Sequence, residues 1–250
     1  MEIKIPKELK DDSILEALCE FRFSSAVPLP SEVVIGRLSD CGSWQGYKVN
    51  RLPVSDFPEY VRMKEVGLRY LPLLELINQD GNQRIRIGGN VISFHIVKPY
   101  CGWSDFEPQL NGLVNCLFSK IKKITVERIG FRYVNALSAN LHTIQSVGDL
   151  NVGITSGGMP ITENFNLNYE REYSDSHVVS TRIATAGYVK GSIPNDTALV
   201  VDIDVRSTPK LAVNDVEAAM KWVQEAHGYE KQAYFVLFKK EKLDTLVKEW

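Results

Sequence analysis

Phe21-Arg22-Phe23 and Phe131-Arg132-Tyr133 are two similar strings at an offset of 110 residues, and each lies in an apolar, strand-like run. The same offset relates Phe94 to Asp204, which lie in strand-like runs that each lead into a Trp-containing helical stretch. Such a repeat decides the fold, because each copy must form the same supersecondary unit. We therefore interpret the chain as a duplication, with one unit at 1–123 and a second at 124–250, packed either separately or as one compact domain. Chance similarity of two strand–strand–helix patterns is the alternative, because the halves share few identical residues.

Alternating apolar residues and turn signals predict the elements of each half. In the first half we expect strands at 14–24, 60–66, 68–77, 84–87 and 91–97 and helices at 31–38 and 103–121. In the second half we expect strands at 125–137, 161–173, 177–189 and 197–206, with helices at 142–150, from 215 onward and at 243–250. The class is therefore α+β. Each half runs strand, short helix, antiparallel strands and long helix, which resembles a helix-grip arrangement, a curved sheet wrapped around its last helix.

Turn and cap residues mark several boundaries. Asn78–Asn82 contains an Asp-Gly pair, which supplies the positive φ of a tight hairpin. Ser31 is the expected N-cap of the short helix. Ser104, with Glu107 three residues later, matches a capping box at the start of the first long helix.

The end of the second long helix is ambiguous in the sequence. Apolar residues keep helical spacing from 215 through 238, which favours one long helix. Gly228 and the β-prone run at 234–238 favour a strand after residue 226 instead. We favour the long helix.

Composition excludes some classes of function. The 250 residues are 44% hydrophobic and 24% charged with a net charge of −2, so no global basic field attracts nucleic acid or an anionic membrane. No apolar run approaches the roughly 20 residues that span a bilayer, and the N-terminus has no signal-peptide core. The four cysteines are scattered without a C-x-x-C pair, so we expect buried thiols without disulfides or zinc. A cytoplasmic protein is the expectation.

Arginines on two strand-like runs are the first candidates for a binding site. Strand alternation places Arg128 and Arg132 on one face of their strand, where guanidinium groups can hold a carboxylate or phosphate. Arg22 takes the place of Arg132 in the first half. The alternative is structural pairing with carboxylates of a neighbouring strand, such as Glu20.

Two aspartates on another strand are the only metal candidates. Asp202 and Asp204 are two residues apart, so their carboxylates point to the same face and suit a divalent cation with oxygen ligands. A third carboxylate has no clear candidate in the sequence. The alternative is that both aspartates face solvent or an arginine such as Arg182.

The histidines and glycines form no catalytic motif. The chain has no G-x-S-x-G, Walker or Rossmann string and no H-E-x-x-H, and it identifies no cofactor. His227 lies on the apolar side of the second long helix, and His95 alternates with apolar residues on a strand, so each is a core histidine or a functional one. The ligand-binding candidates are therefore Arg22, Arg128, Arg132, Tyr133 and His227.

The chain resembles an uncharacterised, sporadically distributed prokaryotic family. The resemblance lies in the strings EALCEFRF at Glu16–Phe23 and ERIGFRYVN at Glu127–Asn135, and in Ala226-His227 near Tyr234-Phe235. It covers nearly the whole chain, but its strings are strand-packing motifs and imply no known activity. A patchy distribution implies genes that move horizontally, as components of mobile or defence-related operons do.

These observations favour a non-catalytic, cytoplasmic binding protein. Its partner would be a protein of a mobile or defence-related operon or a small ligand, homodimerisation is an option, and nucleic acid and membrane are disfavoured. The alternative is an enzyme acting on a nucleotide or phosphorylated small molecule, with Arg128, Arg132, Asp202 and Asp204 as its anion and metal site.

Overall fold

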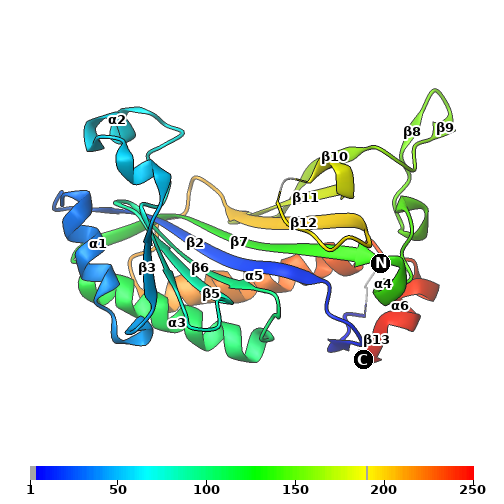
Figure 1. The fold of residues 1–250 in the computed structure, drawn as a ribbon, viewed down its shortest axis with the longest axis horizontal. Coiled ribbons are helices and arrows are strands. Elements are labelled where there is room, and N and C mark those ends of the chain that lie inside the picture. Colours follow the sequence, from blue (N-terminus) through cyan, green and yellow to red (C-terminus); the bar gives the residue numbers. More distant parts are fainter. Residues whose placement is uncertain (1–3, 190) are drawn as a thin grey trace. The chain divides into compact units, whose positions relative to one another are not determined.

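The computed structural model describes residues 4–189 and 191–250 and shows an α+β protein with a large antiparallel sheet (Figure 1). Among these residues the helices are α1 (Ser31–Ser39), α2 (Glu59–Lys64), α3 (Trp103–Lys120), α4 (Ala139–His142), α5 (Val216–Phe235) and α6 (Lys240–Leu246). The strands of the main sheet are β2 (Ile14–Ser25), β3 (Lys48–Arg51), β4 (Leu74–Ile77), β5 (Gln83–Ile87), β6 (Val91–Val97), β7 (Ile124–Ser138), β10 (Asn166–Ser174), β11 (His177–Thr185) and β12 (Thr197–Ser207). Short two-stranded pairs join β1 (Glu8–Leu9) to β13 (Val247–Glu249) and β8 (Thr155–Ser156) to β9 (Met159–Pro160). Within the described part of the chain, no helix is long and apolar enough to cross a membrane.

The chain divides into two compact units that are discontinuous in sequence. Unit 1 comprises 1–16, 132–206 and 226–250, and unit 2 comprises 17–131 and 207–225. The boundary expected at 123/124 lies inside unit 2. The reason is local: β2, β7, β12 and α5 each contribute residues to both units, so no cut between consecutive elements separates them.

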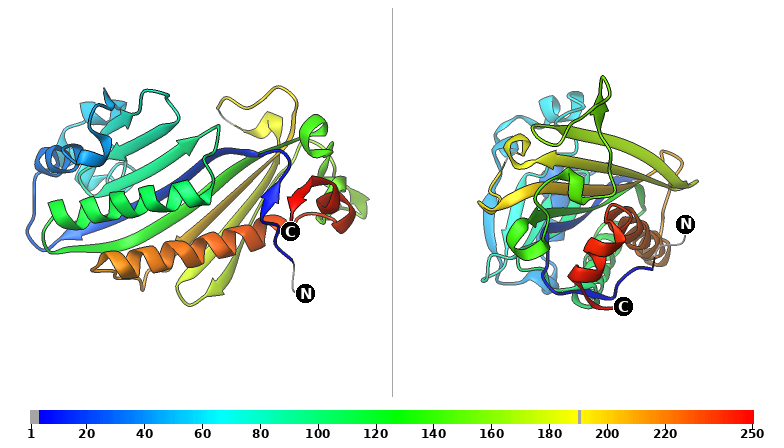
Figure 2. Two further views of the ribbon diagram at one scale, coloured as in Figure 1. Left: turned by 90° about the horizontal axis from the view of Figure 1, so that it is seen from below. Right: turned by 90° about the vertical axis from the view of Figure 1, so that its right-hand side faces the viewer.

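Unit 2 is built on an antiparallel meander of hairpins. Its strands follow the order β7-β2-β6-β5-β4-β3, and β3 is the edge. The predicted Asn78–Asn82 hairpin joins β4 to β5, and Gly81 adopts the positive φ (74°) that this turn requires. Helix α3 lies along one face of these strands (Figure 2), where Phe106 stacks on Phe94 of β6 with ring centroids 5.6 Å apart.

Three local predictions for unit 2 are wrong. Residues 60–66 form helix α2 and a turn in place of a strand, because Pro58 presets the first turn of a helix at Glu59. Ser31 is the first residue of α1 after Pro30, and its hydroxyl donates to Glu59 without capping the helix. Helix α3 has Gly102 as its N-cap and no side-chain cap, so the capping box expected at Ser104 is absent.

The prediction of four free thiols is also wrong. Cys41 and Cys116 form a disulfide across 75 residues, with their Cα atoms 6.3 Å apart, while Cys19 and Cys101 are free. Cysteine spacing does not reveal this pair, because α3 brings Cys116 beside the end of α1 only in the folded unit.

Unit 1 combines an antiparallel sheet with the second half of α5. Its strands follow the order β10-β11-β12-β7, and β10 and β11 form the predicted long hairpin. The favoured long helix is confirmed, since α5 runs to Phe235 and Gly228 lies inside it. Helix α6 begins at Lys240 and ends at Leu246, so the last predicted helix is displaced and its final residues form β13.

Strand β7 contains an irregularity that the alternation pattern did not predict. Ile124 and Val126 are buried at its start, but burial resumes at Ile129 and not at position 128. The amide of Ile129 donates to the hydroxyl of Ser207 at 3.0 Å. An extra residue at this point restores the predicted faces from Ile129 onward.

Candidate functional site

Charged and apolar residues alternate on the hairpin of β5 and β6 in unit 2. Ile85 pairs with Phe94, which contacts α3, whereas Arg84 pairs with His95 and Arg86 pairs with Ser93. Because successive side chains of a strand point to opposite faces, Arg84, Arg86, Ser93 and His95 share the face away from α3. The α2 segment lies on this side of the unit (Figure 1).

A buried glutamate holds the two arginines of this face. Glu75 on β4 is directly opposite Arg86 and accepts a hydrogen bond of 2.9 Å from its Nε. A second ion pair of 3.7 Å joins Glu75 to Arg84. The Nε of Arg84 is buried and has no hydrogen-bond partner among the described residues. One carboxylate therefore positions two guanidiniums, each with about a third of its side chain exposed.

A serine–histidine pair lies beside the arginines. The hydroxyl of Ser93 is 2.8 Å from Nε2 of His95, and both residues are buried. Their positions on β6 make them cross-strand neighbours of Arg86 and Arg84. The pair therefore adds a hydroxyl and an imidazole to a site that is otherwise cationic.

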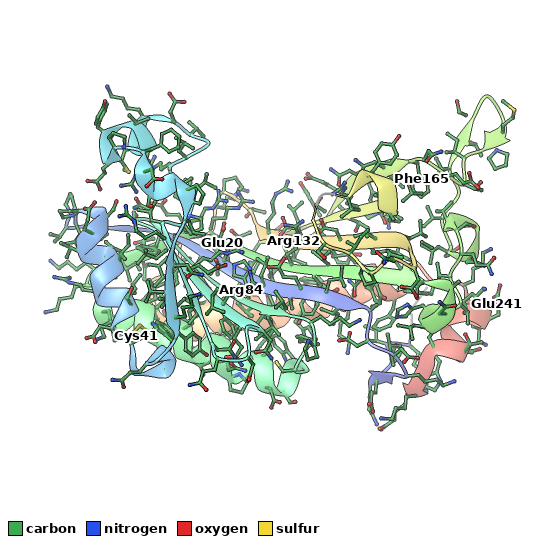
Figure 3. The ribbon with its side chains drawn as sticks, viewed as in Figure 1. Glu20, Cys41, Arg84, Arg132, Phe165 and Glu241 are labelled. Atoms are coloured by element: carbon green, nitrogen blue, oxygen red, sulfur yellow. A yellow bond between two sulfur atoms is a disulfide. The ribbon has the colours of Figure 1, made fainter. Side chains whose placement is uncertain are left out.

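Strand β2, the neighbour of β6, extends the same face. Arg22 donates from Nε to Glu20 at 2.7 Å, and its guanidinium lies 4.9 Å from the ring of Tyr70. Figure 3 marks Glu20 and Arg84 on their strands. We call this set the arginine face of unit 2; its members are Arg22, Arg84 and Arg86 with Glu20, Glu75, Ser93 and His95. Three arginines against two glutamates leave a net positive charge.

Unit 1 brings together the predicted residues Arg132, Asp202 and Asp204. Arg132 donates to both carboxylate oxygens of Asp202, at 2.7 Å from Nε and 2.6 Å from Nη2. This bidentate pair raises the pKa of Arg132 above its ordinary value, with smaller contributions from Asp204 and Glu16. The partner of Arg132 is thus an aspartate and not Glu20.

The metal hypothesis for these aspartates gains no third ligand. Among the described residues no group of three or more His, Cys, Asp or Glu side chains is arranged to hold a metal ion. A cation at Asp202 would have to displace both hydrogen bonds from Arg132. The hypothesis stays a prediction of the sequence alone.

The helix side of unit 1 holds two further predicted residues, Tyr133 and His227. Their rings lie 6.4 Å apart, and burial lowers the pKa of His227 to about 4, so the ring is neutral at pH 7. One turn further along α5, Glu230 is buried, and Lys231 is the charged group that acts on its carboxyl. Burial raises the pKa of Glu230 to about 8, so its carboxyl is protonated at neutral pH.

A short hydrogen-bond chain lies beside Glu230. The hydroxyl of Ser13 donates to Oδ1 of Asn135 at 2.9 Å and lies 2.8 Å from the hydroxyl of Tyr234. Because Ser13 has one hydroxyl proton, Tyr234 donates to Ser13. Burial raises the pKa of Tyr234, which keeps the phenol protonated. This cluster is satisfied internally and offers a ligand no free charged group.

The remaining predicted residues, Arg22 and Arg128, belong to unit 2. Arg22 is a member of the arginine face, whereas Arg128 is half-buried at the irregularity of β7. The sequence-based candidates therefore fall into two groups, with Arg132, Tyr133, His227, Asp202 and Asp204 in unit 1.

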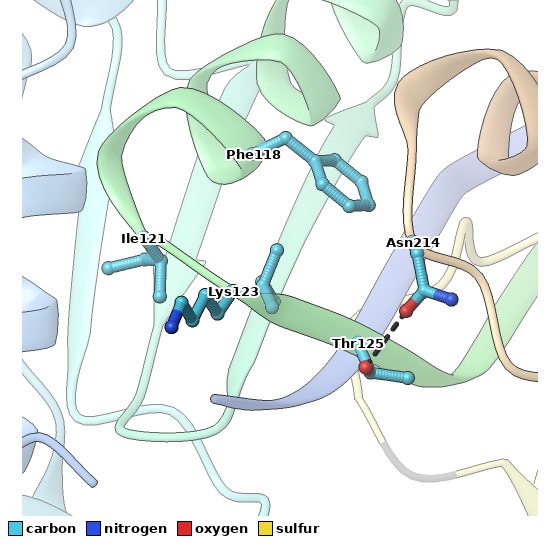
Figure 4. A pocket seen from close by; sticks show the side chains of 6 residues that line it. Phe118, Ile121, Lys123, Thr125 and Asn214 are labelled. Atoms are coloured by element: carbon cyan, nitrogen blue, oxygen red, sulfur yellow. Dashed lines mark hydrogen bonds between the residues drawn. The ribbon is translucent and has the colours of Figure 1, made fainter. Parts of the chain in front are cut away.

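A hollow at the end of α3 is a weaker candidate for a ligand-binding site. It has a volume of about 410 Å³ and is lined by Phe118, Ile121, Lys123, Ile124, Thr125 and Asn214 (Figure 4). The hydroxyl of Thr125 donates to Oδ1 of Asn214 at 2.9 Å. Lys123 is exposed and supplies its only charge among the described residues, so the hollow lacks convergent polar groups.

Sequence reasoning missed Glu75, Arg84, Arg86 and Ser93. A signal for three of them existed, because the turn between β5 and β6 at Gly88-Gly89-Asn90 fixes the register of the two strands. The centre of this turn lies between Gly89 and Asn90, where the amide of Gly88 donates to the carbonyl of Val91. Counting outward from that centre pairs Arg84 with His95 and Arg86 with Ser93. Glu75 was hidden, since 68–77 was predicted as one strand and only its last four residues form β4.

No protein-family model matches the chain, and no curated protein matches it. The family resemblance carried by Glu16–Phe23 and Glu127–Asn135 therefore stays a prediction.

Proposed function

We propose that the chain is a non-catalytic binding protein whose ligand is a small molecule carrying a carboxylate or phosphate group. The site is the arginine face of unit 2. The observation that carries the proposal is the buried Nε of Arg84, which has no partner among the described residues although Glu75 orients the guanidinium. A buried donor without an acceptor costs about 1–3 kcal/mol, and an anionic ligand would remove that cost.

The geometry of the arginines suits an anion. Arg84 and Arg86 are neighbours on one face of β5, and each keeps about a third of its side chain exposed. Planar guanidinium groups bind carboxylate and phosphate through two parallel N–H donors. Because Glu75 already fixes both side chains, little side-chain entropy would be lost on binding.

The neighbouring groups favour a molecule with further polar atoms. Ser93 and His95 offer a hydroxyl and an imidazole next to the arginines, and Tyr70 covers Arg22 at the margin. A bare inorganic anion would use the arginines alone. A small organic acid or a phosphorylated metabolite would also contact the serine–histidine pair.

Isothermal titration with inorganic phosphate and with citrate tests the proposal. Arg84→Gln is the informative variant, because it removes one donor while Arg86 still pairs with Glu75. The matched control is Arg51→Gln, since Arg51 is an exposed arginine on edge strand β3. We expect at least roughly tenfold weaker binding in Arg84→Gln and no change in the control. Equal binding by all three proteins, or no binding by the native chain, would refute the site.

An enzyme acting on a phosphorylated small molecule is the second candidate function. The 2.8 Å contact between the Ser93 hydroxyl and His95 Nε2 favours it, because a serine within reach of a base can act as a nucleophile. A hydrolysis screen with p-nitrophenyl phosphate and p-nitrophenyl acetate separates the two functions. Turnover by the native chain that disappears in Ser93→Ala supports the enzyme. If the native chain and the variant both lack turnover, the binding function is supported.

Two wider proposals accompany the binding function. The first is that the two halves of the chain arose by tandem duplication of one ancestral segment. A set of diverged sequences with a clear 110-residue repeat would support it. The proposed location is the cytoplasm, where reducing thiols act on the Cys41–Cys116 pair. Thiol counting in freshly lysed cells tests the location, since four free thiols are expected there and two in an oxidising compartment.

A further inference from the structure

A separate cavity of about 270 Å³ lies on the helix side of unit 2. Its walls come from α3, from strands β5 and β6, and from the 3₁₀ turn at Gly42–Trp44. Trp44, Ile85, Phe94 and Leu113 form the apolar part of the lining, and each is buried. The arginines of the arginine face lie on the opposite side of the same strands, so the cavity is independent of that site.

The cavity exists because α3 has a glycine where a side chain would fill it. Gly112 lies mid-helix, and a Cβ placed there would meet only the hydroxyl of Ser43, at 3.8 Å. Glycine inside a helix costs about 1 kcal/mol relative to alanine. The missing side chain does not serve close packing of α3 against another backbone, because no backbone atom from outside α3 lies near Gly112.

The wall opposite Gly112 is held rigidly. Trp44 donates from Nε1 to the carbonyl of Leu38 at 2.9 Å, which fixes its ring. Cys41 at the start of this turn lies beside Cys116 of α3, one helical turn beyond Gly112, with their Cα atoms 6.3 Å apart. The space between the turn and the helix is therefore pre-formed and does not depend on a mobile side chain.

The polar groups at the cavity are uncharged. Gln109 uses its Nε2 to donate to the carbonyl of Asp105 at 2.8 Å, which leaves its side-chain oxygen as an acceptor. The hydroxyl of Tyr47 donates to Gln83 at 2.7 Å, and burial raises the pKa of Tyr47, so this phenol is neutral. The lining contains no ionisable acid or base other than this phenol among the described residues.

We infer that this cavity binds a small, uncharged, planar aromatic molecule with one hydrogen-bond donor. Trp44 and Phe94 provide aromatic surfaces for stacking or edge contacts. The absence of charge from the described lining excludes an ionic ligand, because an unpaired charge is costly to bury. The volume is just below the usual range of ligand pockets, which limits the ligand to one or two rings. The free oxygen of Gln109 would accept from the N–H or O–H of the ligand.

Calorimetric titration with indole and phenol tests this inference, with benzoate as the charged probe. Gly112→Leu is expected to fill the cavity and weaken indole binding at least roughly tenfold, without moving the phosphate binding of the arginine face. The control is Gly36→Leu, because Gly36 is also helical, is exposed on α1 and has no atom near its missing side chain.

Folding of the filled variant is checked by circular dichroism. If Gly112→Leu does not fold, Gly112→Ala gives the same test with a smaller expected loss, since its single carbon also enters the space. Unchanged indole binding in the folded Gly112 variant would overturn the inference. Binding of benzoate as tight as that of phenol would also overturn it, and so would the absence of indole binding by the native chain at millimolar concentration.

Discussion

Two glutamates of this protein are almost equally buried but are accommodated in opposite ways. Glu75 in unit 2 is 6% exposed and is held by two arginines, whereas Glu230 in unit 1 is 5% exposed and has Lys231 as the charged group that acts on it. Two guanidinium groups face the carboxylate of Glu75. Glu230 loses its charge because burial raises its pKa to about 8. Burial alone therefore does not decide how a carboxyl group is accommodated; its partners do.

The difference also separates a candidate site from a structural cluster. The ion pairs of Glu75 leave guanidinium surface exposed for a ligand. The groups around Glu230 are Lys231, His227 and Tyr234 on its own helix, with Asp12 and Ser13 beside Tyr234. None of these groups offers a paired, exposed cation. The same residue type thus organises binding in one unit and core packing in the other.

The largest predicted effect comes from removing the charge of Glu75. We expect Glu75→Gln to lower the free energy of unfolding by about 2–4 kcal/mol, because it leaves two partly buried arginines without their anion. Urea unfolding at pH 7 measures this loss. Glu230→Gln is the control, since its native carboxyl is already neutral at that pH. Similar losses in the two variants would break the comparison.

The second effect is a pH dependence that belongs to Glu230. Its folded pKa of about 8 lies above its unfolded value, so the folded state binds the extra proton and stability falls as pH rises toward and through 8. Between pH 6.5 and 8 the loss from this group is about 1.5 kcal/mol. Urea unfolding at both pH values should show that Glu230→Gln lacks this loss. An identical pH profile in the variant and the native chain would contradict it.

His227 is predicted to act in the opposite direction at lower pH. Its folded pKa of about 4 lies below its unfolded value of about 6.5, so its contribution is present above pH 6.5 and is lost as pH falls. We expect a loss of about 1.5 kcal/mol between pH 6.5 and 5, which His227→Asn should remove. Thermal unfolding at pH 5 and 6.5 measures it. A steeper acid loss in the variant would reverse the proposed sign.

The smallest predicted effect is the contribution of the Arg22–Glu20 ion pair to the stability of unit 2. Arg22 and Glu20 each keep more than a quarter of their side chains exposed, so their pair is partly screened by water. We expect Glu20→Gln to cost about 0.5 kcal/mol and to cost less at high salt. Urea unfolding at two salt concentrations measures this. A loss as large as that of Glu75→Gln would show that burial of the acid does not set the energy.

Much of the hairpin framework was readable from local pattern. The Asp-Gly turn at Asn78–Asn82, the alternation along β5 and β6, and the helical spacing of α3 and α5 all act over a few residues. Local pattern failed at 60–66, where Pro58 initiates a helix within a run of β-prone residues. It failed again at the N-caps of α1 and α3. The pattern predicts Ser31 and Ser104 as the caps, but Pro30 and Gly102 occupy the N-cap positions.

The candidate site was less accessible to sequence reasoning. Arg22 and His95 were noted, but the pairing of Glu75 with Arg84 and Arg86 joins residues of two strands. The sequence predicts pairing of Arg132 with a carboxylate of a neighbouring strand such as Glu20, and the carboxylate is that of Asp202 on β12, 70 positions away. Long-range pairs depend on which strands become neighbours, and strand order is not encoded in periodicity.

The sequence by itself determined the α+β class, the hairpins and the two long helices, because these follow from interactions between residues near in the chain. Only the tertiary structure decided that the carboxyl of Glu230 is neutral, which cysteines are joined, and where a cavity opens beside Gly112. Those properties depend on the solvent, charges and atoms that surround a side chain after folding. Glu75 and Glu230 illustrate this, since the same side chain at nearly the same burial meets two different surroundings.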